Sequence, residues 1–85
     1  MSTFDSTDTN QFFHFRKEAL SILKEDKNAN SVAKWDNNLK LHAVFYRNQD
    51  FAIKRGCLNS PDEDGLIFGY EKGFSPDKPN YRWNN

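Results

Sequence analysis

Hydrophobic positions in the first third of the chain recur with the period of an α-helix. Placed 100° apart, the apolar side chains fall within one arc, which contains Phe12, Phe15, Ala19, Ile22 and Leu23. Asp8 precedes the arc as an expected N-cap, and Gln11 stands three positions later, as in a capping box. The pattern predicts a helix over residues 8–28, preceded by a loose arm of mostly small and polar residues at 1–7.

The apolar arc of this helix is wider than packing against one surface requires. Phe13 and Leu20 lie seven residues apart on one flank and widen the arc to about half of the circumference, whereas a surface helix needs roughly 100°. Arg16 lies between them. An aromatic, an aliphatic and an arginine side chain together are typical of interface hot spots, so this flank is a candidate binding surface.

After residue 30 the hydrophobic spacing changes to the alternation of a half-buried strand. Alternate positions between Leu39 and Tyr46 are apolar, with Leu41, Ala43 and Phe45 on one side. The preceding Asn-Asn pair at 37–38 suits a tight turn because asparagine tolerates a positive φ. The turn implies an earlier short strand over residues 32–36 that carries Trp35.

The same segment also fits a second helix. Ser31 would be its N-cap, and its inner stripe would consist of Val32, Trp35, Leu39, Ala43 and Tyr46. Two asparagines in the middle of that helix and the alternation that follows favour the strands.

Two further strands are predicted downstream. A turn at 47–50 leads to a strand at 51–58, and an odd loop length would place Phe45 opposite Ile53 on the apolar face. A Ser-Pro-Asp-Glu turn that ends at Gly65 leads to a short strand at 66–70. Residues 72–85 are predicted to form an irregular tail.

Together these elements predict one α+β domain over residues 1–85. An N-terminal amphipathic helix packs on a three- to four-stranded antiparallel sheet that spans residues 31–71. A chain of 85 residues has no room for a second core.

Because 15% of the residues are aromatic, and each buried ring removes roughly 150 to 250 Å² from water, the core is expected to consist largely of rings. The expected core rings are Phe12, Phe15, Trp35, Phe45, Phe51 and Phe68.

Charge and cysteine content narrow the expected environment. Twelve basic residues balance twelve acidic ones, so no overall field attracts a polyanion or a membrane surface. Cys57 is the single cysteine, which rules out an intrachain disulfide and indicates a reducing compartment. No signal peptide or membrane-spanning run is visible. We therefore expect a cytoplasmic protein with no membrane partner.

No motif for catalysis, metal binding or cofactor binding is visible. His14, His42 and Cys57 lack the spacing of zinc ligands, and the acidic run at 62–65 is only a fragment of a calcium loop. Phosphate-loop, dinucleotide, zinc-protease and esterase signatures are missing. The sequence therefore predicts no catalytic residue, no metal and no cofactor.

The polar face of the predicted sheet offers an alternative function. This face would bind single-stranded nucleic acid by stacking bases on Tyr46 or Trp35 and pairing phosphates with lysine and arginine. The predicted residues are Lys40, His42, Tyr46, Lys54 and Arg55. With His42 as a proton shuttle, the same set would make a metal-free ribonuclease toxin. The neutral net charge weakens both possibilities, and an ordinary solvated strand face explains the pattern as well.

Protein binding is the leading functional hypothesis. It uses the flank of Phe13, Arg16 and Leu20 and a second set of the same composition at the C-terminus, Tyr81, Arg82 and Trp83. Closing the core of a ring-rich domain explains both sets equally well. Small stand-alone chains often bind and inhibit or mask a larger protein, as immunity proteins and phage-encoded inhibitors do. That argument comes from size and simplicity rather than from any single residue.

Overall fold

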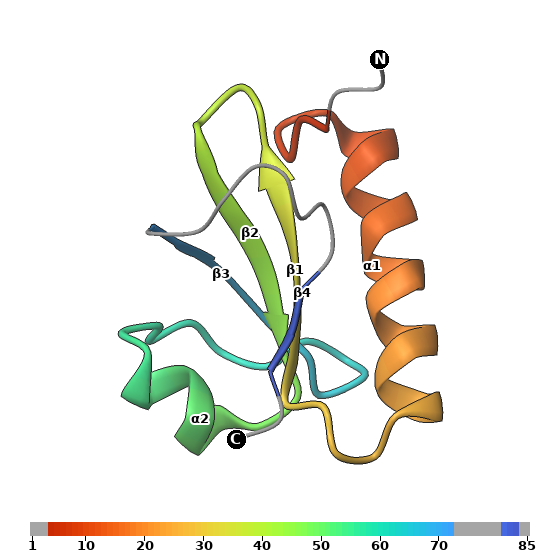
Figure 1. Cartoon of the computed structure of the whole chain (residues 1–85), viewed down its shortest axis with the longest axis vertical. Coiled ribbons are helices and arrows are strands. Elements are labelled where there is room, and N and C mark those ends of the chain that lie inside the picture. Colours follow the sequence, from red (N-terminus) through yellow and green to blue (C-terminus); the bar gives the residue numbers. More distant parts are fainter. Residues whose placement is uncertain (1–3, 73–80, 84–85) are drawn as a thin grey trace.

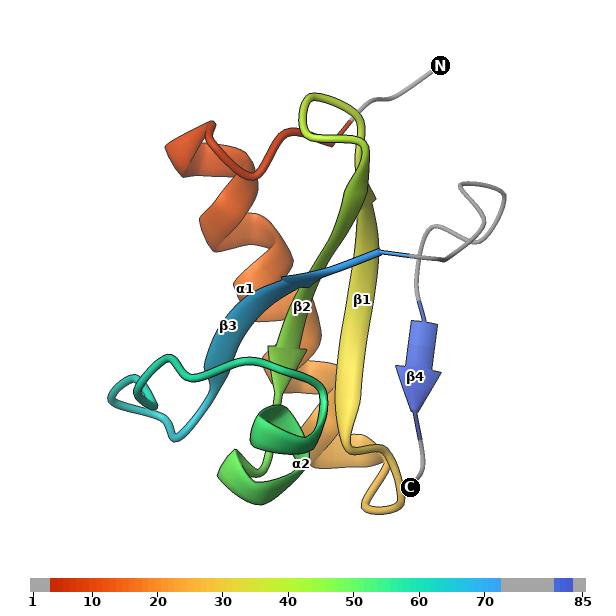
Figure 2. The same cartoon turned by 90° about the vertical axis from the view of Figure 1, so that its left-hand side faces the viewer.

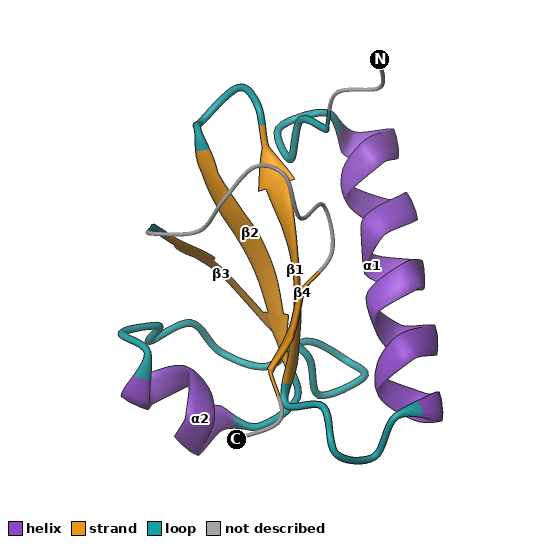
Figure 3. Cartoon of the chain, in the orientation of Figure 1, coloured by secondary structure: helices purple, strands orange, loops and turns teal. Residues whose placement is uncertain are grey.

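The sheet of this protein has a helix on each face. The computed structural model describes residues 4–72 and 81–83, the last three by their backbone alone. Helix α1 (Thr9–Glu25) covers one face and the short helix α2 (Gln49–Lys54) lies on the other (Figures 1 and 2). The antiparallel sheet has the order β3-β2-β1-β4, and its strands are β1 (Ser31–Asp36), β2 (Leu41–Tyr46), β3 (Ile67–Glu71) and β4 (Tyr81–Trp83) (Figure 3). The predicted α+β class is confirmed.

Helix α1 begins where the sequence predicts. The Asp8 carboxylate accepts hydrogen bonds from the backbone N–H groups of Asn10, at 3.0 Å, and Gln11, at 3.2 Å. In a capping box the Gln11 side chain would accept from the backbone N–H of the N-cap residue, Asp8. Here it accepts instead from the N–H of Asp5, at 3.0 Å, three residues before the N-cap. The Asp8 and Gln11 side chains thus satisfy backbone N–H groups that have no partner within the helix.

The face of α1 that packs on the sheet carries a cluster of aromatic rings. Phe15 is fully buried, and its ring centroid lies 5.2 Å from that of Phe45 on β2. Phe12 lies 4.9 Å from Phe68 on β3 and 5.6 Å from Phe45. Tilted and edge-on geometries at these separations are favourable for aromatic pairs. These four rings are in the predicted core set, and they fix α1 across β2 and β3.

The N-terminal arm is not loose over the part that the structure describes. Phe4 is buried with its ring centroid 5.2 Å from Phe15, and its carbonyl accepts from the Asn37 N–H at 2.9 Å. Ser6 donates from both its N–H and its hydroxyl to the buried carboxylate of Asp36. The prediction of a loose arm is therefore wrong for residues 4–7, because the Phe4 ring and the hydrogen bonds of Ser6 hold this segment against the core.

A predicted turn residue, Arg47, closes the C-terminal end of α1. Its guanidinium donates to the carbonyl oxygens of Leu23 at 2.5 Å, Asp26 at 2.8 Å and Ala29 at 2.9 Å. These carbonyls belong to the last turn of the helix and to the connection that follows it. A cation at this end also matches the negative end of the helix dipole. Arg47 thus ties the end of α1 to the end of β2.

The segment between residues 31 and 46 is a β-hairpin, which excludes the alternative second helix. Val32 pairs with Phe45, and Trp35 pairs with His42. The turn spans residues 37–40 and has its positive φ, 56°, at Lys40 rather than at an asparagine. The Asp36 carboxylate holds this turn by accepting from the backbone N–H groups of Asn38 and Leu39.

The predicted strand at 51–58 is wrong, because α2 occupies the first half of that segment. The Asn48 side chain caps the helix by accepting from the N–H of Asp50 at 2.8 Å and of Phe51 at 3.4 Å. Gly56, with φ at 87°, follows the helix end. Phe45 therefore pairs with Phe68 on β3 and not with Ile53. Alternating apolar residues over so short a run fit a strand and a helical turn about equally well.

Strand β3 forms one edge of the sheet, close to the predicted position. Its buried Gly69 faces Cys57, whose Sγ would lie 2.8 Å from a Cβ added at the glycine. Any larger residue at 69 would require the Cys57 side chain to move. β4 pairs with β1 at the opposite edge, within the predicted irregular tail, and the rest of that tail from residue 73 lies outside the described residues.

Neither helix within the described ranges has the length and apolar composition needed to cross a bilayer.

Replacing Arg47 tests whether it holds the end of α1. Arg47→Ala should lower the free energy of unfolding by about 2 kcal/mol, because three carbonyls lose a charged donor. Arg47→Lys should recover only part of the loss, since a single ammonium cannot match the planar guanidinium fork. Chemical denaturation measures both. The exposed Lys27→Ala control should change stability by less than about 0.5 kcal/mol, and an equal effect of both alanine variants would contradict this assignment.

Candidate functional site

A groove of about 410 Å³ lies between α1 and the loop that leads into β3. Four phenylalanine rings line it, from α1, β2 and β3, namely Phe12, Phe13, Phe45 and Phe68. Arg16 lines it from the helix side, and Asp62 and Glu63 line it from the loop side. The volume lies within the roughly 300 to 1,000 Å³ of small-ligand sites. The groove therefore has room for a few side chains.

Phe13 stands at the side of this groove and is largely exposed. It presents 56% of its surface to solvent, although the neighbouring Phe12 is partly buried. The two rings meet edge to face, with centroids 5.4 Å apart. Because successive helical residues point about 100° apart, the packing of Phe12 on the sheet turns Phe13 outwards. The exposed ring is thus held on a rigid helix and backed by the aromatic core.

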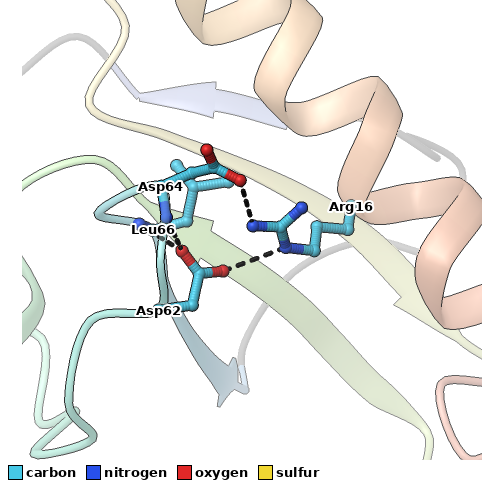
Figure 4. Close-up of polar contacts among 4 residues, drawn as sticks. All are labelled: Arg16, Asp62, Asp64 and Leu66. Atoms are coloured by element: carbon cyan, nitrogen blue, oxygen red, sulfur yellow. Dashed lines mark hydrogen bonds and ion pairs between the residues drawn. The ribbon is translucent and has the colours of Figure 1, made fainter.

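Arg16 clasps the loop on the other side of the groove (Figure 4). Its Nε donates to Asp62 Oδ2 at 3.0 Å, and an Nη donates to Asp64 Oδ2 at 2.5 Å. The Arg16 side chain is only 16% exposed, so the pair of contacts is partly shielded from water. A guanidinium that bridges two carboxylates fixes direction as well as distance. The clasp fixes the distance between the two walls of the groove.

The loop itself is folded around Asp62. The Oδ1 atom of Asp62 accepts from the backbone N–H groups of Asp64, at 2.9 Å, and Leu66, at 3.0 Å, while Oδ2 faces Arg16 (Figure 4). The backbone of Asp62 also bonds Leu66 and Gly65, and Gly65 takes a φ of 82°. A positive φ of this kind favours glycine. The acidic wall is therefore preformed and does not need a ligand to order it.

The clasp shifts the ionisation of both partners. The hydrogen bonds that Arg16 donates to Asp62 and Asp64 raise its pKa above the ordinary range of arginine. Burial acts to raise the pKa of Asp62, but the hydrogen bonds from Arg16 and from the Leu66 and Asp64 N–H groups outweigh it, and the pKa is lowered overall. Asp62 thus carries its charge throughout the physiological range.

The structure divides the residues predicted to bind a partner. Phe13 and Arg16 both line the groove, although Arg16 is engaged within the chain. Leu20 is half-buried and packs against the core cluster. Residues 81–83 form β4, at the sheet edge farthest from β3, and their side chains lie outside the description. The backbone thus places the second predicted set on the edge strand beside β1, whereas Phe13 and Arg16 line the groove on the β3 side.

The residues of the nucleic-acid alternative do not form the predicted solvated face. His42 and Tyr46 are fully buried, and Lys54 is on α2 rather than on a strand. The Tyr46 hydroxyl donates to Glu71, which also accepts from Arg55 at 2.8 to 3.0 Å. Burial, followed by this hydrogen bond, raises the pKa of Tyr46 beyond its ordinary range. Lys40, in the hairpin turn, is exposed. This face of the sheet is part of the core because α2 covers it. A strand at 51–58, as predicted, would have left the face open to solvent.

Sequence reasoning missed the acidic loop as part of the site. The Asp-Glu-Asp-Gly run at 62–65 was expected only to form a capped turn. Its composition is a recognisable signal for side-chain-to-backbone turns. Nothing in the sequence connects this run to Arg16, which lies 46 residues earlier than Asp62.

The chain shows no similarity to known proteins that would name a function. No protein-family model, curated protein or solved structure matches it. Across residues 4–72 and 81–83, no three metal-ligating side chains come together. The groove is therefore interpreted from its own geometry.

Substituting Asp62 tests the clasp through pH. Asp62→Asn keeps the acceptor for the loop N–H groups but removes the charge that faces Arg16, so it should cost about 0.5 to 1 kcal/mol at pH 7. A carboxyl whose pKa is lowered by folding stabilises above its unfolded value, near 3.8, and loses this contribution as pH falls through the folded value. The difference between wild type and variant should therefore shrink in acid.

Denaturation curves at neutral and acidic pH measure this difference. Glu63→Gln, on the adjacent exposed residue, is the matched control and should change stability by less than about 0.5 kcal/mol at either pH. A cost of Asp62→Asn that stays constant down to strongly acidic pH would contradict the ion pair as its cause.

Variants of Tyr46 test whether the second face is core. Tyr46→Phe should cost about 1 to 2 kcal/mol because Glu71 loses a donor, and Tyr46→Ala about 3 to 5 kcal/mol because a large cavity replaces the ring. Lys54→Ala, at an exposed position, is the control with little expected effect. Unfolding that is unchanged in Tyr46→Ala would show that this face is open to solvent.

Proposed function

We propose that this chain is a non-catalytic protein that binds a larger protein and masks part of its surface, with the groove beside Phe13 as the contact. The observation that carries the proposal is the 56% exposure of Phe13 beside a groove lined by three further phenylalanines. Exposed aromatic rings next to apolar concave surfaces are typical of interaction sites. A ring kept in water at this position is explained by a partner that covers it.

The rigidity of the site supports binding rather than chance exposure. Phe12 holds the Phe13 ring from behind, and the Arg16 clasp holds the opposite wall. A preformed site loses less conformational entropy when a partner binds, so more of the contact energy remains as affinity. Arg16 contributes by positioning the wall, and Phe13 contributes the contact surface.

An inhibitory role of the immunity-protein or phage-inhibitor type needs only such a surface. Masking works by covering a partner's site, and it requires no reacting group of its own. The free Cys57 fits our proposal that the protein acts in the reducing cytoplasm.

Capture of the partner with and without the Phe13 ring tests the proposed function. Affinity-tagged wild type and Phe13→Ser would be incubated with lysate of the native host, and the bound proteins would be quantified by mass spectrometry. We expect wild type to retain a partner that Phe13→Ser loses by at least about tenfold. The variant should stay folded, since an exposed ring contributes about 1 kcal/mol or less through its edge contact.

Ile53→Ser is the matched control for this experiment. Ile53 is 49% exposed but lies on α2, at the opposite face of the sheet. Its substitution should leave capture unchanged. A partner lost with Ile53→Ser but retained with Phe13→Ser would move the interface to α2 and overturn the assignment, and identical proteomes for wild type and both variants would oppose protein binding.

A further inference from the structure

The charge on the wall of the groove is one-sided. Asp62 and Glu63 line it, and Asp64 stands beside them in the clasp. Among the described lining residues, Arg16 is the one cationic side chain. Two carboxylates contact the single guanidinium and a third, that of Glu63, adds a further negative charge, so the wall remains negative although the whole chain is neutral.

The positive charge of Arg16 is not available to a partner's carboxylate. Its Nε and one Nη already bond Asp62 and Asp64, and its side chain is only 16% exposed. A carboxylate that approached the remaining N–H groups of Arg16 would meet the repulsion of Asp62 and Asp64, which already balance its charge. By contrast, the side chain of Asp64 is 45% exposed and Glu63 is exposed, so both can meet an incoming cation.

The floor of the groove favours the same kind of ligand. The rings of Phe12, Phe45 and Phe68 pack together at centroid distances of 4.9 to 5.6 Å, and Phe12 and Phe68 are only partly buried whereas Phe45 is 1% exposed. An apolar anchor gains from burial there. The face of an aromatic ring also attracts a cation, whereas it gives no such attraction to an anion.

Building on the proposed function, we propose that the groove binds a partner segment in which a bulky apolar side chain is flanked by lysine or arginine. The apolar side chain packs on the aromatic floor, and the flanking cations lie at the acidic wall. Charge complementarity of this kind sets specificity and association rate. A polyanion is repelled by the same wall, so nucleic acid is disfavoured at this site.

Two short peptides with identical leucine and phenylalanine positions test the inference. One carries lysine at every polar position, and the other carries glutamate. Fluorescence anisotropy at low salt should show that the wild-type chain binds the lysine peptide at least about tenfold more tightly, and added salt should reduce the difference. Equal or tighter binding of the glutamate peptide, or no binding of either, would overturn the inference.

Charge reversal at one exposed residue locates the effect. Glu63→Lys leaves the Arg16 clasp in place and should weaken binding of the lysine peptide about tenfold. Glu25→Lys makes the same change in net charge at the exposed end of α1 and should have little effect. Equal weakening by both variants would show unspecific attraction and overturn the assignment to the groove.

The Phe13→Ser variant separates this inference from the proposed function. It should weaken both peptides by a similar factor, because it removes apolar contact and no charge. If peptide binding fails but lysate capture remains dependent on Phe13, the protein-binding function stands and only the basic character of the partner is wrong. A labelled single-stranded RNA that binds wild type at low salt and loses affinity in Phe13→Ser would overturn the partner class itself.

Discussion

The packing of α1 against β2 and β3 is the contact on which the rest of this structure depends. Phe15 is buried against Phe45, and Phe12 bridges Phe45 and Phe68. Because a helix is rigid, the packing of these rings also fixes the direction in which every other side chain of α1 points. Phe13 must then point outwards, and Arg16 must point towards the loop before β3. The anchored arm and the Arg47 contacts hold the two ends of the helix and secure this orientation.

The Arg16 clasp converts that orientation into a groove with a defined shape. It joins two segments that are far apart in the sequence, and the loop that it holds is already folded around Asp62. Partial shielding from water makes such contacts stronger than those of fully exposed pairs. The same contacts consume the only cation described on the groove lining, so one arrangement determines both the shape of the wall and its negative sign.

The opposite face of the sheet is closed by different means. Val44, Tyr46 and Ile67 are buried beneath the segment that contains α2. The carboxylate of Glu71 accepts hydrogen bonds from Tyr46 and Arg55, which links α2 to the edge strand β3. A polar network of this kind is favourable because each buried group has a partner. Arg55, expected on a solvated sheet surface, is therefore part of this structural layer, whereas Lys40 lies apart from it in the hairpin turn.

The sequence by itself determined the elements whose cause is local. The N-cap at Asp8, the apolar face of α1, the hairpin at 31–46 and the strand near 67–71 follow from capping chemistry and periodicity, and so does the excess width of the apolar arc that drew attention to Phe13. Only the tertiary structure decided that 49–54 is a helix, because six residues carry too little periodicity and the Asn48 cap outweighed their alternation. It also decided that Leu20 packs half-buried against the core and that Arg16 meets Asp62 and Asp64. Contacts between distant segments depend on the packing of whole elements, and no local pattern encodes them.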